Sequence, residues 1–152
     1  LLTKAKSFGF EQYEISNFCL PGLHSKHNSS YWKFLPYIGI GPSAHSFDGR
    51  QRRWYVRNNT IYTKGVGKNE MWYETEQLSA NEYRNEQILL GLRTAWGLDL
   101  NALKTGFTVK ENAQIEEFAR LGWLTFENQH LILTDKGKLH ADGIAAELFR
   151  VA

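Results

Sequence analysis

Six consecutive residues, His27-Asn28-Ser29-Ser30-Tyr31-Trp32, place an imidazole, an amide and two large aromatic rings side by side in the sequence. An imidazole can bind iron and is a usual axial ligand of haem. Tyr31 and Trp32 add apolar ring faces together with an O–H and an N–H. This combination suits a flat, apolar ligand with a polar or metallic centre. The alternative is structural, with both rings filling a core and Asn28 shaping a turn.

The flanking residues predict that this stretch lies in a loop. Pro21 and Gly22 precede it, and Leu35-Pro36 follows it. Proline interrupts helices and strand ladders, and Ser, Asn and Gly favour turns.

A second stretch, Tyr37–Phe47, alternates isoleucine with glycine and ends in Ser-Ala-His-Ser-Phe. Glycine inside a strand marks a bulge or a close approach to the backbone. The pattern is not a dinucleotide-binding fingerprint, because the third glycine and the following helix are missing. It could line a ligand pocket, or it could be a tight strand crossing that binds nothing.

Other chemical groupings are weaker. His24, His27 and His45 with Cys19 could form a zinc site, although their spacing matches no common zinc finger. The segment 50–62 combines arginines with aromatic rings, which suits nucleic acid, porphyrin propionates or a solvated strand face. These residues are Arg50, Arg52, Arg53, Trp54, Tyr55, Arg57 and Tyr62.

Composition narrows the class of protein. The chain has 152 residues, 42% of them apolar and 22% charged, which is typical of a globular protein. A net charge of +2 gives no argument for a polyanionic partner, and no run of about 18 apolar residues predicts a membrane span. The single cysteine, Cys19, excludes a disulfide within the chain and a cluster held by several thiolates of this chain.

The predicted elements give an α+β fold in two parts. A helix over 1–8 closed by Gly9 and then a strand over 10–18 follow the rhythm of a β/α barrel, with Glu14, Ser16 and Asn17 near the strand's carboxyl end. Strands and loops are expected over 49–67, and residues 64–68 are expected to form a hinge.

From Glu70 onward the pattern turns helical. Met71-Trp72-Tyr73 begins an amphipathic stretch, and a helix capped by Ser79 runs to near Gly97. Asp99 is expected to cap a short helix. A helix over 111–121, two strands at 123–126 and 131–133, and a last helix over 135–149 follow, with Leu139, Ile144 and Leu148 as apolar points. This order predicts a small winged-helix-like domain with a two-stranded wing. Its glutamates disfavour contact with nucleic acid.

The run from Tyr13 to Phe47, with LLGLRTAWGLDL at 89–100 and LTDKGKLHADGIAAELF at 133–149, resembles radical SAM proteins related to oxygen-independent coproporphyrinogen III oxidase. Within them it looks most like the HemW haem-chaperone branch, whose HNxxYW motif is proposed to bind haem. The resemblance implies haem-binding roles for His27, Asn28, Tyr31 and Trp32, with His27 facing the iron. It implies an S-adenosylmethionine-binding wall formed by Gly39, Gly41, Ser43 and His45.

The resemblance also implies a domain organisation. Residues 1–67 would be the last strands of a radical SAM barrel, and 68–152 would be the winged-helix-like C-terminal domain of the coproporphyrinogen oxidase type. The whole protein would bind S-adenosylmethionine and a [4Fe-4S] cluster, and we expect this chain to be a C-terminal fragment that is inactive alone.

Three functions compete. The first is a cytoplasmic haem chaperone that passes haem or porphyrin to apoproteins. The second is a porphyrinogen oxidase that converts two propionates to vinyl groups. The third is a winged-helix nucleic-acid-binding module. Exposed strand edges could also support oligomers.

Overall fold

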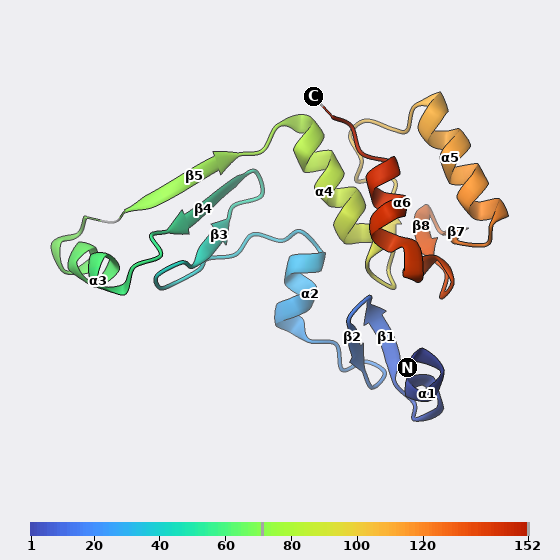
Figure 1. Ribbon diagram of the computed structural model, residues 1–152, viewed down its shortest axis with the longest axis horizontal. Coiled ribbons are helices and arrows are strands. Elements are labelled where there is room, and N and C mark those ends of the chain that lie inside the picture. Colours follow the sequence, from blue (N-terminus) through green and yellow to red (C-terminus); the bar gives the residue numbers. More distant parts are fainter. Residues whose placement is uncertain (71, 152) are drawn as a thin grey trace. The chain divides into compact units, whose positions relative to one another are not determined.

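The computed structural model describes residues 1–70 and 72–151, which form two compact units. Residues 1–33 and the chain from Asn81 onward make the first unit, and Phe34–Ala80 makes the second. The helices are α1 (Leu2–Ser7), α2 (Lys26–Trp32), α3 (Asn59–Lys68), α4 (Ala80–Leu92), α5 (Val109–Arg120), the 3-10 helix η1 (Gly137–His140) and α6 (Ala141–Glu147) (Figure 1). The strands are β1 (Glu11–Glu14), β2 (Asn17–Cys19), β3 (His45–Phe47), β4 (Gln51–Tyr55), β5 (Tyr73–Gln77), β6 (Leu98–Asp99), β7 (Leu124–Glu127) and β8 (His130–Leu133).

An antiparallel hairpin of β1 and β2 begins the sheet structure of the first unit, with Glu11 opposite Cys19. Its turn contains neither Gly nor Pro. Instead, the Glu14 carboxylate accepts hydrogen bonds from the Ser16 amide (2.9 Å) and from Asn17 Nδ2 (2.5 Å). The hairpin is also bonded to the segment after α4: the Ala95 amide donates to the Tyr13 carbonyl of β1 over 3.0 Å, and the Ile15 amide donates to the Arg93 carbonyl over 3.0 Å. The hairpin is therefore joined to the C-terminal half of the chain.

The hydrophobic core lies where α4, α5 and α6 pack with the antiparallel sheet β6-β8-β7 (Figure 1). Apolar residues four apart, such as Ile88 and Leu92 or Ile144 and Leu148, place one apolar stripe of a helix toward this core. Its members are Ile88, Leu92, Leu98, Leu103, Ile115, Leu124, Leu131, Leu133, Ala141, Ile144, Ala145 and Leu148.

Local signals explain the boundaries of these elements. Thr108 and Glu111 form a capping box at the start of α5, each side chain accepting from the other's backbone amide. Asn128 and Gln129 join β7 to β8 with φ of 48° and 65°, as a two-residue hairpin turn with two left-handed positions requires.

The second unit is built on the antiparallel sheet β3-β4-β5 and on α3. Asn58 caps α3 by accepting from the Ile61 amide (3.0 Å), and Asn69 ends the helix in the left-handed conformation, with φ of 58°. Every residue of β5 is exposed.

Several sequence-based expectations prove wrong in the first unit. The single strand expected over 10–18 is the hairpin of β1 and β2, because Glu14 holds a turn that no Gly or Pro announces. Asp99 lies in β6 and stabilises a turn through the Asn101 amide, so it caps no helix. Leu139 is 82% exposed, although Ile144 and Leu148 are buried as expected.

The second unit also differs from expectation. Residues 64–68 are the last residues of α3 and form no hinge. Trp72 precedes β5 and Tyr73 begins it, where helical character was expected, and Met71 lies outside the described residues. The predicted helix at the N-terminus, the one after Ser79 and the hairpin at 124–133 are confirmed.

The mixed α and β character is confirmed, whereas the barrel remnant and the winged helix stay predictions. Strands of a β/α barrel are parallel, and the strand pairs among the described residues are antiparallel. The predicted domain boundary at 67/68 also stays a prediction. The compact units are a separate division of the chain, with limits at 33/34 and 80/81. None of the helices in the described part of the chain is long and apolar enough to cross a membrane.

Candidate functional site

The HNSSYW stretch forms most of α2, so the expectation of a loop is wrong. Ser25 begins the helix, because its Oγ accepts a hydrogen bond from the Asn28 amide over 3.2 Å. Residues four apart in a helix are neighbours on its surface. His27 therefore pairs with Tyr31, and Asn28 pairs with Trp32.

The first pair faces solvent. The rings of His27 and Tyr31 meet edge to face with centroids 5.0 Å apart, and both residues are exposed. Among residues 1–70 and 72–151, the His27 imidazole has no hydrogen-bond or ion-pair partner. A ring nitrogen of His27 is thus open to an external ligand, beside an aromatic ring.

The second pair is half-buried and packs toward the rest of the unit. Asn28 Nδ2 donates to Asn17 Oδ1 over 3.5 Å. The Arg93 guanidinium lies 5.6 Å from the centre of the Trp32 ring, in cation–π range. These contacts fix the rotation of α2, and with it the direction of His27 and Tyr31.

The carboxylate of Glu14 joins these contacts into one network. Glu14 is buried, with 1% of its surface exposed. Its Oε2 accepts from Asn17, and its Oε1 accepts from Arg93 Nε (3.3 Å) and Nη2 (3.1 Å). The chain of contacts from Asn28 through Asn17, Glu14 and Arg93 to Trp32 therefore closes on α2 itself.

Arg93 and Trp96 belong to this site, although sequence analysis assigned them no role. Trp96 contacts the His24 ring (centroids 5.5 Å apart), and Lys33 Nζ lies 5.0 Å from the centre of the Trp96 ring. One aromatic side chain thus contacts residues at both ends of α2. The signal in the sequence was the RTAWG segment, in which a charge and a large ring lie next to a turn.

The residues expected to contact S-adenosylmethionine lie in the second unit. The Gly39 amide donates to Ser46 Oγ (3.0 Å), and the Gly41 amide donates to the Tyr62 hydroxyl (3.1 Å). A Cβ on Gly39 would lie 2.0 Å from the carbonyl oxygen of His45. This glycine is therefore explained by close packing of the chain on itself.

The remaining two residues of that set are also held within the unit. Ser43 has a positive φ of 61°, and its amide donates to the Val56 carbonyl. The His45 ring stacks on Trp54, with centroids 5.9 Å apart. Contact with S-adenosylmethionine stays a prediction for all four residues.

The histidines and cysteine considered as a zinc site separate into different surroundings. His27 pairs with Tyr31, and His45 stacks on Trp54. Cys19 and His24 do come together, but with Glu11, which sequence analysis left out.

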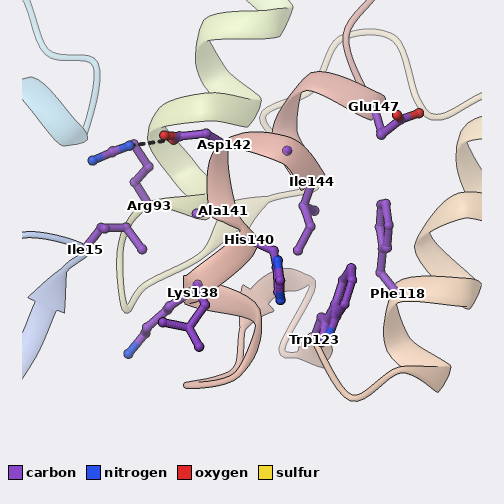
Figure 2. Close-up of a pocket in the computed structure, with 12 residues that line it drawn as sticks. Ile15, Arg93, Phe118, Trp123, Lys138, His140, Ala141, Asp142, Ile144 and Glu147 are labelled. Carbon is purple, nitrogen blue, oxygen red and sulfur yellow. Dashed lines mark hydrogen bonds and ion pairs between the residues drawn. The ribbon is translucent and has the colours of Figure 1, made fainter.

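A shallow pocket of about 620 Å³ lies beside α6, shown in Figure 2. Trp123 is stacked between His140 (4.3 Å between centroids) and Phe118 (5.8 Å). Arg93 lies at the other side of the pocket, where Nη1 binds Asp142 Oδ1 over 2.6 Å. The pocket thus shares one residue with the network beneath α2.

Comparison with known proteins finds similar sequences over most of the chain. Residues 78–140 match the family described as HemN C-terminal domain. The haem chaperone HemW of Mycobacterium tuberculosis (strain H37Rv) is 36% identical over 141 residues, covering 92% of this chain and 35% of that protein. HemW of Bacillus subtilis (strain 168) is 30% identical over 148 residues, covering 91% of this chain and 38% of that protein.

Over most of its length the chain is similar to proteins named HemW. It spans little more than a third of the length of these curated HemW relatives. The solved structure of coproporphyrinogen III oxidase (HemN) from Escherichia coli, a radical SAM enzyme, aligns with a TM-score of 0.70 at 14% identity. The alignment covers 97% of this chain and 39% of the HemN chain, and it establishes likeness of fold alone. The resemblance read from the sequence is confirmed.

Proposed function

We propose that α2 is a haem-binding helix, with His27 as an axial ligand of the iron and Tyr31 against the porphyrin. The exposed pair of His27 and Tyr31 carries this proposal, because it offers an imidazole without a competing partner beside an aromatic face. The HemW relatives are named haem chaperones, which supports the same ligand. Transfer of the haem to an apoprotein would complete that function.

For Asn28 and Trp32 we propose a positioning role in place of the haem contact that the resemblance implies. Both pack toward the network of Glu14 and Arg93, and they hold α2 in position. We therefore separate the motif into two ligand-facing residues and two positioning residues.

The other implied cofactors fit this chain less well. A [4Fe-4S] cluster is held by cysteine thiolates, usually four. Cys19 is the single cysteine; burial raises the pKa of its thiol, which also donates a hydrogen bond to Glu11. The residues of this chain do not fit a cluster, so no step is assigned to one. Contact of residues 39–45 with S-adenosylmethionine is a proposal for the whole protein.

A titration of the 152-residue chain with ferric haem, followed by absorbance, tests the proposal. His27→Ala should lower haem affinity by about tenfold or more, equivalent to about 1.4 kcal/mol. His45→Ala is the matched control, because it removes an exposed imidazole that stacks on Trp54 in the second unit. Equal affinities of wild type and His27→Ala would contradict the proposal.

The same titration with metal-free protoporphyrin separates haem binding from porphyrinogen handling. If His27 binds iron, the variant should lose affinity for haem and keep its affinity for the metal-free ring. A surface built to receive a porphyrinogen would bind both rings alike, and His27→Ala would then change neither or both.

A further inference from the structure

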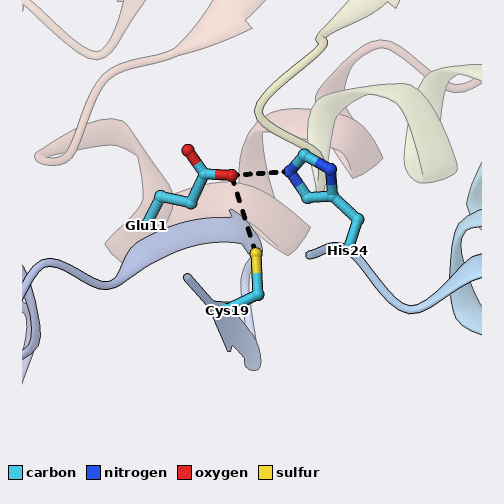
Figure 3. Close-up of side chains that lie close together, drawn as sticks. All are labelled: Glu11, Cys19 and His24. Atoms are coloured by element: carbon cyan, nitrogen blue, oxygen red, sulfur yellow. Dashed lines mark hydrogen bonds and ion pairs between the residues drawn. The ribbon is translucent and has the colours of Figure 1, made fainter. Parts of the chain in front are cut away.

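Three side chains with metal-binding atoms converge beside the start of α2, as Figure 3 shows. They are Glu11 on β1, Cys19 on β2 and His24 in the loop that follows. Their carboxylate oxygen, thiol sulfur and imidazole nitrogen all lie within 4.8 Å of one another. We infer that Glu11, Cys19 and His24 form a zinc-binding site, with water as the fourth ligand.

The backbone brings these side chains together. Glu11 and Cys19 are directly opposite each other in the hairpin, so their side chains lie on the same face of it. A turn then reverses the chain, with the Leu23 amide donating to the Leu20 carbonyl (3.0 Å) and Gly22 at φ of 75°. This turn returns His24 to the same face. The site therefore needs no rearrangement of the backbone.

The distances are close to those that zinc requires. Zinc bonds of about 2.3 Å to sulfur and about 2.0 Å to nitrogen or oxygen, in tetrahedral geometry, place ligand atoms about 3.3–3.6 Å apart. Glu11 Oε1 lies 3.6 Å from Cys19 Sγ and 2.8 Å from His24 Nε2. The sulfur–oxygen distance already fits, and the imidazole needs to move away by about half an ångström.

The ligand types favour zinc over the hard cations. Calcium and magnesium prefer sets of oxygen atoms, whereas sulfur, nitrogen and oxygen together suit zinc. Three protein ligands with one open position are typical of zinc sites that keep a water. The side chains of Glu11 and His24 are 42% and 32% exposed, so solvent and the ion have access.

The chemical balance of binding is simple. Without metal, burial raises the pKa of the Cys19 thiol most, the hydrogen bond and charge of Glu11 raise it further, and the backbone of Leu23 lowers it. Zinc would replace the thiol proton, which passes to the buffer as the zinc–sulfur bond forms. Zinc would bind the unprotonated Nε2 of His24, so a proton held there in the contact with Glu11 moves to Nδ1, as the other tautomer, or passes to the buffer.

The surroundings connect this site to α2. The His24 ring is contacted by Tyr13 (5.1 Å between centroids) and by Trp96 (5.5 Å), both nearly perpendicular to it. The next residue, Ser25, is the N-cap of α2. A metal bound by His24 would therefore fix the point at which the HNSSYW helix begins.

Cobalt(II) is the probe that tests the site in the 152-residue chain, because it replaces zinc and absorbs light. Since the chain has one cysteine, a thiolate-to-cobalt absorption band in the near ultraviolet can come from Cys19 alone. We expect that band at one cobalt per chain, with visible bands of tetrahedral intensity, and we expect zinc to abolish both. Absence of the thiolate band in the folded wild type would overturn the inference.

Variants assign the other ligands. His24→Ala and Glu11→Gln should each weaken zinc binding by about tenfold or more, measured by competition with a coloured chelator. His27→Ala, three residues from His24, should bind zinc like the wild type. Retention of wild-type affinity by His24→Ala, or an equal loss in His27→Ala, would overturn the assignment. Circular dichroism of each variant shows whether the fold is kept. The cobalt spectrum of the wild type tests whether Cys19 binds the metal, and this test does not depend on any variant.

Discussion

The carboxylate of Glu14 and the guanidinium of Arg93 form an ion pair, 3.1 Å between Oε1 and Nη2, in which the Glu14 side chain is completely buried. The same guanidinium binds Asp142 over 2.6 Å, and that side chain is 77% exposed. One arginine thus has two acidic partners, of which one is buried and the other is exposed. Burial of a charge without its partner is costly, whereas exposed pairs contribute little.

Glu14→Gln should therefore destabilise the fold far more than Asp142→Asn. A glutamine amide nitrogen would face donors on one side or the other, because Arg93 binds Oε1 while Ser16 and Asn17 bind Oε2. We expect a loss of about 3 kcal/mol for Glu14→Gln and of less than about 1 kcal/mol for Asp142→Asn. Urea unfolding measures both, and equal losses would show that burial of Glu14 is not what matters.

Glu111 gives the fold a dependence on acid. It is buried between Arg84 (3.1 Å) and Arg150 (2.8 Å) and caps α5. Burial acts to raise its pKa, but the hydrogen bonds from Arg150 and Thr108 and the charge of Arg84 outweigh it and lower the pKa of Glu111 to about 2. A carboxyl whose pKa is lower in the folded state stabilises that state at every pH above the pKa that the group has in the unfolded chain. This stabilisation is lost as the pH falls toward the pKa that the group has in the folded state.

The difference in unfolding free energy between the wild type and Glu111→Gln should shrink by about 3 kcal/mol between pH 6 and pH 2. Glu117→Gln is the control on the same helix, since Glu117 pairs with Arg120 in the open. Its difference from the wild type should vary little over that range. Parallel pH curves for wild type and Glu111→Gln would contradict this account.

The sequence predicted helices best where apolar residues recur over several turns. Ile115 marks α5 and Ile144 marks α6 by spacing alone, and both are buried. The prediction that Leu139 is buried was wrong because this residue lies in η1, whose three-residue period places it outward. In α3, Gly65 and Gly67 suggested a break, but the caps Asn58 and Asn69 make a helix of the segment.

The sequence identified residues of the candidate site, but it did not show which way their side chains point. The motif identified His27 and Trp32, while their opposite orientations depend on α2, which the Ser and Asn content of the stretch concealed. Glu11 could not be added to Cys19 and His24 without knowing the hairpin register, because that pairing depends on a turn held by a side chain.

Gly137 and Gly143 lie six residues apart and should respond oppositely to alanine. A Cβ on Gly137 would lie 1.9 Å from the carbonyl oxygen of Trp123, which is backbone that cannot rotate away. Gly137 is also held there, because its amide donates to Thr134 Oγ1 (3.0 Å) while the Thr134 amide donates to Trp123. Gly137→Ala must therefore separate η1 from the start of β7, and we expect it to cost about 2 kcal/mol or more.

Gly143 lies inside α6, and a Cβ there would meet nothing within 4 Å. Alanine is favoured over glycine in a helix by about 0.5–1 kcal/mol, so Gly143→Ala should raise the melting temperature. Thermal unfolding of both variants checks the pair. A stabilised Gly137→Ala would mean that η1 does not pack against Trp123, and with it the stacking of His140 on the Trp123 ring would fail, because η1 ends at His140.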